Sequence, residues 1–180
     1  MKYSTLIFES HSISDTLRFG RAFADALPEQ AAVALHGTLG AGKTLLVQGM
    51  ASALGINPHT VTSPTFVICN EYIGRKTLIH ADVYRLNDSD DFLAIGGAEW
   101  FQSNAITLIE WAEKIDDCLP LNLYTITISQ RSESARQIVL ESPWQEVTDA
   151  VSAAITRIRL PQSGQTLEIS CESLVLNLHH

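Results

Sequence analysis

The segment from Gly37 to Thr44, with the sequence Gly-Thr-Leu-Gly-Ala-Gly-Lys-Thr, contains residue types that together can bind a phosphate chain. It matches the pattern G-x-x-x-x-G-K-[ST] at every fixed position. Its glycines allow positive φ, so that backbone N–H groups can curl around an anion. Lys43 would place its charge on the β- and γ-phosphates, and the Thr44 hydroxyl would bind Mg²⁺. The pattern therefore predicts a nucleotide-binding phosphate loop.

Two carboxylates further along the chain each end an apolar run. Asp82 ends residues 77–82, and Glu110 ends residues 106–110. In phosphate-loop proteins, an acid at the carboxyl end of a neighbouring buried strand orients Mg²⁺ or its water. A structural ion pair is the alternative, with Arg85 as a partner for Asp82. Because both acids end hydrophobic strands, we favour a shared metal site, and the sequence leaves open which acid contacts the metal directly.

The segment Ser63-Pro64-Thr65-Phe66 is interpreted as a nucleotide-sensing switch. Pro64 excludes a regular helix and makes Ser63 extended. We therefore expect an exposed segment, just downstream of the phosphate loop, that carries the hydroxyls of Thr62, Ser63 and Thr65. In such switches a threonine reaches the metal or the γ-phosphate. An ordinary surface turn is the alternative interpretation.

Four other polar or aromatic residues have open roles. The Thr16 hydroxyl either contacts a nucleotide base or caps its own helix. Trp111, directly after Glu110, either packs beside the nucleotide or fills the core. His36 and His80 fall on predicted strands, where we interpret both as structural histidines.

The elements that must position these residues follow from the apolar pattern. Residues 31–35 predict a strand buried on both faces, and a helix follows the loop until Gly55 and Pro58 end it. Residues 66–72 and 77–82 predict an antiparallel hairpin. Further strands are predicted at 6–8, 106–110, 123–129 and 137–140, with helices starting near Ser12, Asn87 and Pro143.

Length, charge and cysteine content limit the classes of function. The chain has 180 residues, and we expect one domain over residues 1–160 with a C-terminal appendage over 161–180. The net charge of −8 argues against a broad nucleic-acid surface, so any role in nucleic-acid metabolism would act through another protein. Three distant cysteines, with no signal-peptide pattern and no membrane-spanning apolar run, lead us to expect a cytoplasmic protein with no membrane contact.

Taken together, these motifs resemble the bacterial tRNA threonylcarbamoyladenosine biosynthesis ATPase family TsaE, formerly YjeE. The combination of S-P-T-F, D-V-Y-R-L and I-E-W is much more specific than the phosphate loop alone, and the resemblance covers roughly residues 1–160. The matching segments are Asp15-Thr16 with Gly20, Leu39 to Thr44, Ser63 to Phe66, His80 to Leu86, and Leu108 to Glu113 with Leu119-Pro120.

The resemblance implies an α/β phosphate-loop NTPase fold, with a mixed, mainly parallel sheet flanked by helices. It also implies weak, Mg²⁺-dependent and partner-stimulated ATPase activity. In that family the protein acts with TsaB and TsaD, and only indirectly on tRNA, in forming N6-threonylcarbamoyladenosine.

The same resemblance assigns a role to each site residue. Lys43, Asp82 and Thr65 would be catalytic, Thr44 and Glu110 would bind Mg²⁺, and Thr16 would lie near the base. The residues that would bind ATP are Thr16, Leu39, Gly40, Ala41, Gly42, Lys43, Thr44 and Trp111. Two features depart from the family: Thr38 stands where Asp is usual, and the tail is longer.

Three other functions are alternatives to a partner-activated ATPase. A small-molecule kinase of phosphate-loop fold needs an arginine-bearing lid, for which only Arg131 and Arg136 are candidates. A GTPase is disfavoured because no D-x-x-G follows the loop and N-K-x-D is absent from the sequence. A nucleotide-sensing adaptor, in which hydrolysis only resets the bound state, is not separable from an ATPase by sequence.

Overall fold

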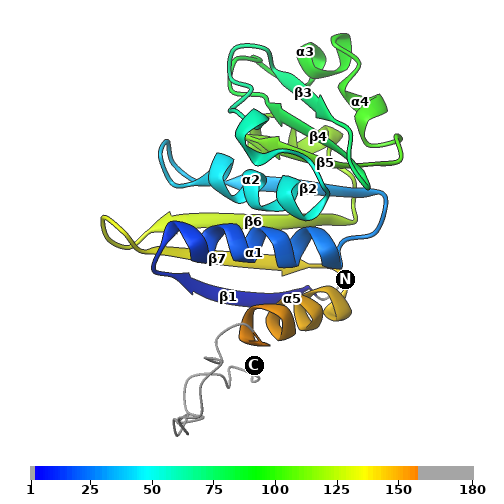
Figure 1. The fold of residues 1–180 in the computed structure, drawn as a ribbon. Helices are drawn as coiled ribbons and strands as arrows, with labels where there is room; N and C mark the ends of the chain where they lie inside the picture. Colours follow the sequence, from blue (N-terminus) through cyan, green and yellow to red (C-terminus); the bar gives the residue numbers. More distant parts are fainter. Residues whose placement is uncertain (1–2, 158–180) are drawn as a thin grey trace, which may run out of the picture.

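The computed structural model of the protein describes residues 3–157. These residues form a seven-stranded sheet with helices on both faces (Figure 1). The predicted appendage, residues 161–180, lies outside the described residues, so the domain boundary at 160 stays a prediction.

The sheet is mixed, with a parallel core and antiparallel edges. Its strand order is β1-β7-β6-β2-β5-β4-β3, and β6, β2, β5 and β4 run parallel to one another. β1 and β7 on one side, and β3 on the other, pair antiparallel with their neighbours. The predicted α/β fold with a mixed sheet is confirmed. The strands are β1 (Ser4–Ser10), β2 (Ala31–His36), β3 (Cys69–Tyr72), β4 (Thr77–Asp82), β5 (Ala105–Glu110), β6 (Leu123–Gln130) and β7 (Arg136–Ser142).

Three longer helices share one face of this sheet. α1 (Ile13–Ala26) packs against both α2 (Lys43–Ala53) and α5 (Gln145–Arg157). The other face is covered by shorter elements: α3 (Ser89–Ala94), α4 (Gly97–Trp100) and the 3-10 helix η2 (Ala112–Cys118), while the 3-10 helix η1 (Pro58–Thr60) follows α2. Within residues 3–157, none of these helices has the length and apolar character needed to cross a membrane.

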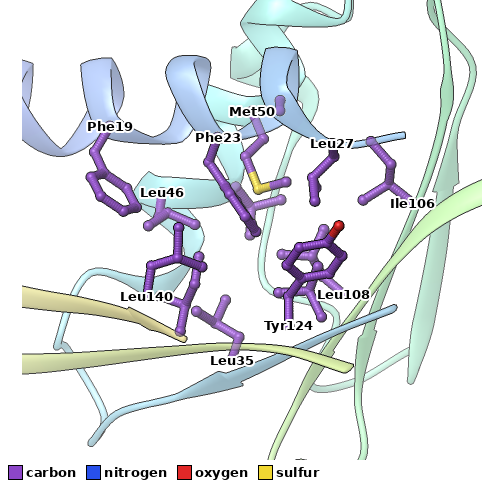
Figure 2. Packing of buried hydrophobic residues seen from close by; sticks show 14 of the residues in the cluster. Phe19, Phe23, Leu27, Leu35, Leu46, Met50, Ile106, Leu108, Tyr124 and Leu140 are labelled. Carbon is purple, nitrogen blue, oxygen red and sulfur yellow. The ribbon is translucent and has the colours of Figure 1, made fainter. Parts of the chain in front are cut away.

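Alternation along the central strands divides the core into two clusters. Val33 and Leu35 of β2 face α1 and α2, whereas Ala34 between them faces the shorter elements. Phe19 and Phe23 of α1 pack on Leu46 and Met50 of α2 above the sheet (Figure 2). Both faces of the parallel core are therefore buried, as its apolar runs predict.

The predicted hairpin is correct in its pairing and wrong in where it starts. β3 begins at Cys69, whereas a strand was predicted from Phe66. The N–H groups of Val67 and Ile68 both donate to the Pro64 carbonyl, and Ile68 has a φ of 69°. The β-forming side chains of this segment are thus held in a turn by the proline before them.

Two cysteines within the described residues, Cys69 and Cys118, are free and partly buried. Burial, aided by the nearby charge of Glu71, raises the pKa of the Cys69 thiol to about 11. Cys69 therefore stays protonated, and unreactive as a nucleophile, at neutral pH.

α1 and α2 approach each other through a glycine on each helix. A Cβ at Gly20 would lie 2.4 Å from the Leu46 carbonyl oxygen, and a Cβ at Gly49 would lie 2.4 Å from that of Leu17. In both places the obstacle is backbone, which cannot rotate away as a side chain can. These glycines therefore set the spacing of the helix that begins at the phosphate loop.

We expect Gly49→Ala to destabilise the protein by about 1–3 kcal/mol, because forced overpacking outweighs the better helix propensity of alanine. Arg21→Ala, on the exposed face of α1, is the control and should unfold close to wild type. Urea unfolding followed by circular dichroism measures both. A Gly49→Ala protein as stable as wild type would contradict the close-approach explanation.

Candidate active site

Three parallel strands of the core end in one row. In the register of the sheet, Glu110 of β5 lies between Leu35 of β2 and Asp82 of β4. The chain leaving β2 enters the loop at Gly37, so the loop and both acids meet at the carboxyl edge of the sheet. This edge is where open α/β sheets bind ligands.

The loop conformation depends on its three glycines. Gly37, Gly40 and Gly42 have φ values of 148°, 77° and 111°, in the region that side chains disfavour. Gly37 is also required for space, because a Cβ there would lie 2.7 Å from the Ile128 carbonyl oxygen. α2 starts at Lys43 without a side-chain cap. Its N-terminal dipole is thus directed at the loop, as in anion-binding sites.

A pocket of about 590 Å³ opens beside this loop. Most of the predicted site residues line it, drawn from the loop, the Ser63–Phe66 segment, and the ends of β4 and β5. The lining residues are Leu39, Gly40, Gly42, Lys43, Thr44, Leu45, Ser63, Thr65, Asp82, Tyr84, Glu110 and Trp111.

Thr16 and Ala41 are the predicted site residues outside this lining. Thr16 is 2% exposed in α1, and its hydroxyl shares a 2.8 Å hydrogen bond with that of Ser10. A base contact by Thr16 stays a prediction that this geometry does not support. Ala41 is buried, and its carbonyl accepts a 3.0 Å hydrogen bond from Arg136 Nε. Arg136 of β7 therefore stabilises the loop through this hydrogen bond.

Lys43 is turned inward, with its side chain 7% exposed. Its Nζ donates to the carbonyls of Gly37 at 2.8 Å and Thr38 at 3.3 Å. The same atom lies 3.5 Å from Glu110 Oε2 and 5.6 Å from the centre of the Trp111 ring. In this arrangement the protein itself neutralises the lysine, and a bound phosphate would replace some of these contacts.

Glu110 is held from two sides. Its Oε1 lies 3.0 Å from His80 Nε2, and its Oε2 faces Lys43. His80 belongs to β4, two residues before Asp82, and is completely buried. It is a buried histidine on a strand, as predicted, but its partner is a predicted metal ligand.

Asp82 is joined to the predicted switch. Its Oδ2 accepts a 2.5 Å hydrogen bond from the Thr65 hydroxyl, which is 2.8 Å from the Ser63 hydroxyl. Its Oδ1 accepts from the backbone N–H of Tyr84 at 2.9 Å. Among the described residues no ion pair joins Asp82 to Arg85, so the alternative role of Asp82 as an Arg85 partner is wrong.

An aromatic pair covers one side of the pocket. Trp111 has a φ of 62°, and its ring centre lies 5.1 Å from that of Tyr84. Lys114 holds Tyr84 in place by donating to its carbonyl and to that of Leu86, each at 2.7 Å. The Trp111 ring, which also faces Lys43, therefore lies at the pocket rather than only in the core.

The oxygen atoms in the pocket fit Mg²⁺. The Thr44 hydroxyl and the Asp82 and Glu110 carboxylates are the hard oxygen ligands that this ion prefers. Within residues 3–157, no group of three or more His, Cys, Asp or Glu is arranged to hold a metal alone. This combination suits an ion held by one or two protein groups together with the phosphates of a nucleotide.

Four features of this site were not indicated by the sequence. They are the Thr65–Asp82 and His80–Glu110 hydrogen bonds, the hydrogen bond from Arg136 to the loop, and Tyr84 in the pocket lining. The first three join residues from different elements. Only the fourth had a signal in the sequence: Tyr84 belongs to the D-V-Y-R-L segment, one of the motifs that carry the family resemblance.

Comparison with known proteins places the chain in a family. Residues 10–138 match the family described as threonylcarbamoyl adenosine biosynthesis protein TsaE. The chain is 45% identical over 122 residues to a Treponema pallidum protein named tRNA threonylcarbamoyladenosine biosynthesis protein TsaE, which covers 68% of this chain and 88% of that protein. A Haemophilus influenzae protein of the same name is 43% identical over 110 residues, covering 58% of this chain and 69% of that protein.

A solved structure agrees with the sequence comparison. The crystal structure of Bacillus subtilis YdiB superposes with a TM-score of 0.68 at 27% sequence identity. The match covers 88% of this chain and 98% of YdiB. On sequence and on structure, the chain belongs to the TsaE family.

Proposed function

We propose that this protein is a Mg²⁺-dependent ATPase that acts with TsaB and TsaD in forming N6-threonylcarbamoyladenosine in tRNA. The observation that carries the proposal is the row of strand ends, which places Glu110 and Asp82 beside a glycine-rich loop and its lysine. The relatives' names supply the pathway. The chain charge of −8 supports an indirect rather than direct role on tRNA.

The residues divide the chemistry among them. Backbone N–H groups of the loop would bind the phosphates, and Lys43 would neutralise the β- and γ-phosphates. Thr44 and Glu110 would hold Mg²⁺, which when bound withdraws charge from the phosphate oxygens. Asp82 would orient the attacking water through a carboxylate oxygen.

The Thr65–Asp82 hydrogen bond links nucleotide binding to this step. In the structure Thr65 donates to Asp82 Oδ2, while Oδ1 is occupied by the Tyr84 N–H. A γ-phosphate that attracts the Thr65 hydroxyl would free Oδ2 to accept a hydrogen bond from water. The same movement would shift Phe66, which is 86% exposed, and so change a surface that a partner protein could contact.

The kinase alternative is not favoured by the positions of the two candidate lid arginines. Arg136 donates to the Ala41 carbonyl and to three carbonyls of the β6–β7 turn. Arg131 donates to Gln137 Oε1 at 2.5 Å. Both guanidinium groups thus have structural partners, and neither is positioned as a closing lid.

The overall test measures ATP hydrolysis by the purified protein with and without TsaB, TsaD and tRNA. We expect slow turnover alone and a changed rate with the partner proteins. Failure to bind either partner in any nucleotide state, together with rapid phosphorylation of a small metabolite, would establish the kinase function instead.

We expect Lys43→Ala to lower ATP turnover by about 100-fold or more, because a charge that stabilises the transferred phosphate is lost. ATP affinity from isothermal titration and the melting curve accompany the rate. Lys76→Ala is the matched control, since Lys76 also donates to a backbone carbonyl, that of Leu27, but lies outside the pocket lining. Wild-type affinity and turnover in Lys43→Ala would contradict the loop assignment.

We expect Asp82→Asn and Glu110→Gln each to depress turnover by about 10²- to 10⁴-fold while nucleotide affinity falls far less. The reason is that carboxylates orient water and metal, whereas loop N–H groups supply most of the binding. Single-turnover hydrolysis and ADP titration separate the two effects. Two amide variants with wild-type rates would show that the acids are structural.

We expect Thr65→Ala to lose the dependence of TsaB and TsaD binding on the bound nucleotide, since the link between the γ-phosphate and Asp82 is removed. A pull-down in the presence of ATP, ADP or neither measures this. Thr65→Ser retains the hydroxyl and should behave as wild type, and so should Thr60→Ala, whose hydroxyl binds the Asn57 carbonyl outside the pocket lining. Nucleotide-dependent binding by Thr65→Ala would exclude Thr65 as the sensor.

A further inference from the structure

We propose that His80 is a positioning residue that holds the Glu110 carboxylate in the orientation needed to bind a nucleotide-associated Mg²⁺ ion. This inference rests on the proposed function, because it assumes that Glu110 acts on a metal. It assigns to a fully buried histidine a role beyond filling the core.

The sheet brings the two side chains together. His80 and Asp82 are two residues apart on β4, so their side chains leave the same face of the sheet. Asp82 is the register partner of Glu110 on β5, which places His80 diagonally behind Glu110 on that face. In this diagonal arrangement, His80 Nε2 and Glu110 Oε1 are 3.0 Å apart, at hydrogen-bond distance.

The two oxygens of Glu110 have separate partners, and only one of these can remain during the proposed reaction. Oε2 faces Lys43, whose charge the proposed function assigns to the phosphates of a bound nucleotide. Once Lys43 leaves, His80 is the remaining side-chain partner of Glu110 among the described residues. A buried carboxylate with no hydrogen-bond donor would be costly, and its side chain would be free to rotate. His80 therefore keeps Glu110 fixed at the step where orientation matters.

The chemistry of the bond sets its direction. An ionised carboxylate only accepts hydrogen bonds, so His80 must donate from Nε2–H. Its Nδ1 is buried and has no hydrogen-bond partner within the described part of the chain. A histidine present only to satisfy the core would be expected to use both nitrogens. The single bond that His80 makes is directed at the predicted metal ligand, which is the arrangement by which outer groups orient a ligand.

The test compares His80→Leu with His80→Gln in the full-length protein. Leucine fills the site without a donor, whereas the glutamine amide can place an N–H donor close to the position of Nε2. ADP affinity is measured by isothermal titration at increasing Mg²⁺ and separately in EDTA, and ATP turnover is measured over the same Mg²⁺ range.

We expect His80→Leu to raise the Mg²⁺ concentration for half-maximal ADP binding and turnover by about 10- to 100-fold. Affinity in EDTA should stay at the wild-type value, and His80→Gln should restore most of the Mg²⁺ response. Thr107→Val is the control, because Thr107 is also a buried polar residue of the core strands but bonds to the Trp100 carbonyl instead. It should leave the Mg²⁺ response unchanged.

An unchanged Mg²⁺ requirement in His80→Leu, or no rescue by His80→Gln, would overturn the positioning role. If His80→Leu does not fold, His80→Asn takes its place, since its shorter amide cannot reach the Nε2 position and should show the raised requirement. Failure of the proposed function is a different result: wild type would then hydrolyse no ATP at any Mg²⁺ concentration, and Glu110→Gln would not alter its Mg²⁺ response.

Discussion

The constraint on which the site depends is the common register of β2, β5 and β4. β5 is buried along its whole length and β4 along nearly all of it, so a slip of one residue would move each apolar set to the wrong face. The same packing that prevents such a slip holds Asp82 beside Glu110, and both beside the loop that leaves β2. The spacing of the two acids is therefore a consequence of the hydrophobic core and not of contacts between the acids themselves.

The ends of β4 and β5 place two carboxylates in a buried position, and nearby donor groups compensate their charge. Asp82 and Glu110 are almost fully buried, yet each carboxylate oxygen faces a hydroxyl, an N–H group or an ammonium group. Lys43 is neutralised by loop carbonyls and by Glu110 in the absence of nucleotide. A bound phosphate chain would compete with these internal partners, so nucleotide binding would rearrange contacts within the protein as well as adding new ones.

The sequence predicted the parts of this site that depend on local chemistry. The loop was identifiable because its residues match G-x-x-x-x-G-K-[ST] at every fixed position. Each buried strand was identifiable because its apolar run is continuous. The contacts of His80 and Thr65 were not predictable, because they join residues 30 and 17 positions apart and require the strand order and register. The start of β3 was misplaced because Phe66 to Ile68, despite their β propensity, form a turn in which the Pro64 carbonyl accepts the N–H groups of Val67 and Ile68. The hydrogen bond between the Thr16 and Ser10 hydroxyls was likewise not predictable, because nothing local showed that the two side chains would meet.

Two residues with a strained backbone, Ile68 and Trp111, directly contact or follow the two acids. Ile68 and Trp111 have positive φ without being glycine, a conformation that is costly for a β-branched or bulky residue. The Ile68 carbonyl accepts the N–H of Asp82, and Trp111 directly follows Glu110. Such strain persists only where surrounding contacts hold it, and for Trp111 those contacts include Tyr84 and Lys43. Movement of Lys43 toward a phosphate removes one of these supports. Under the proposed function, phosphate binding would therefore also change the surroundings of Trp111 and of the Tyr84 ring that it contacts.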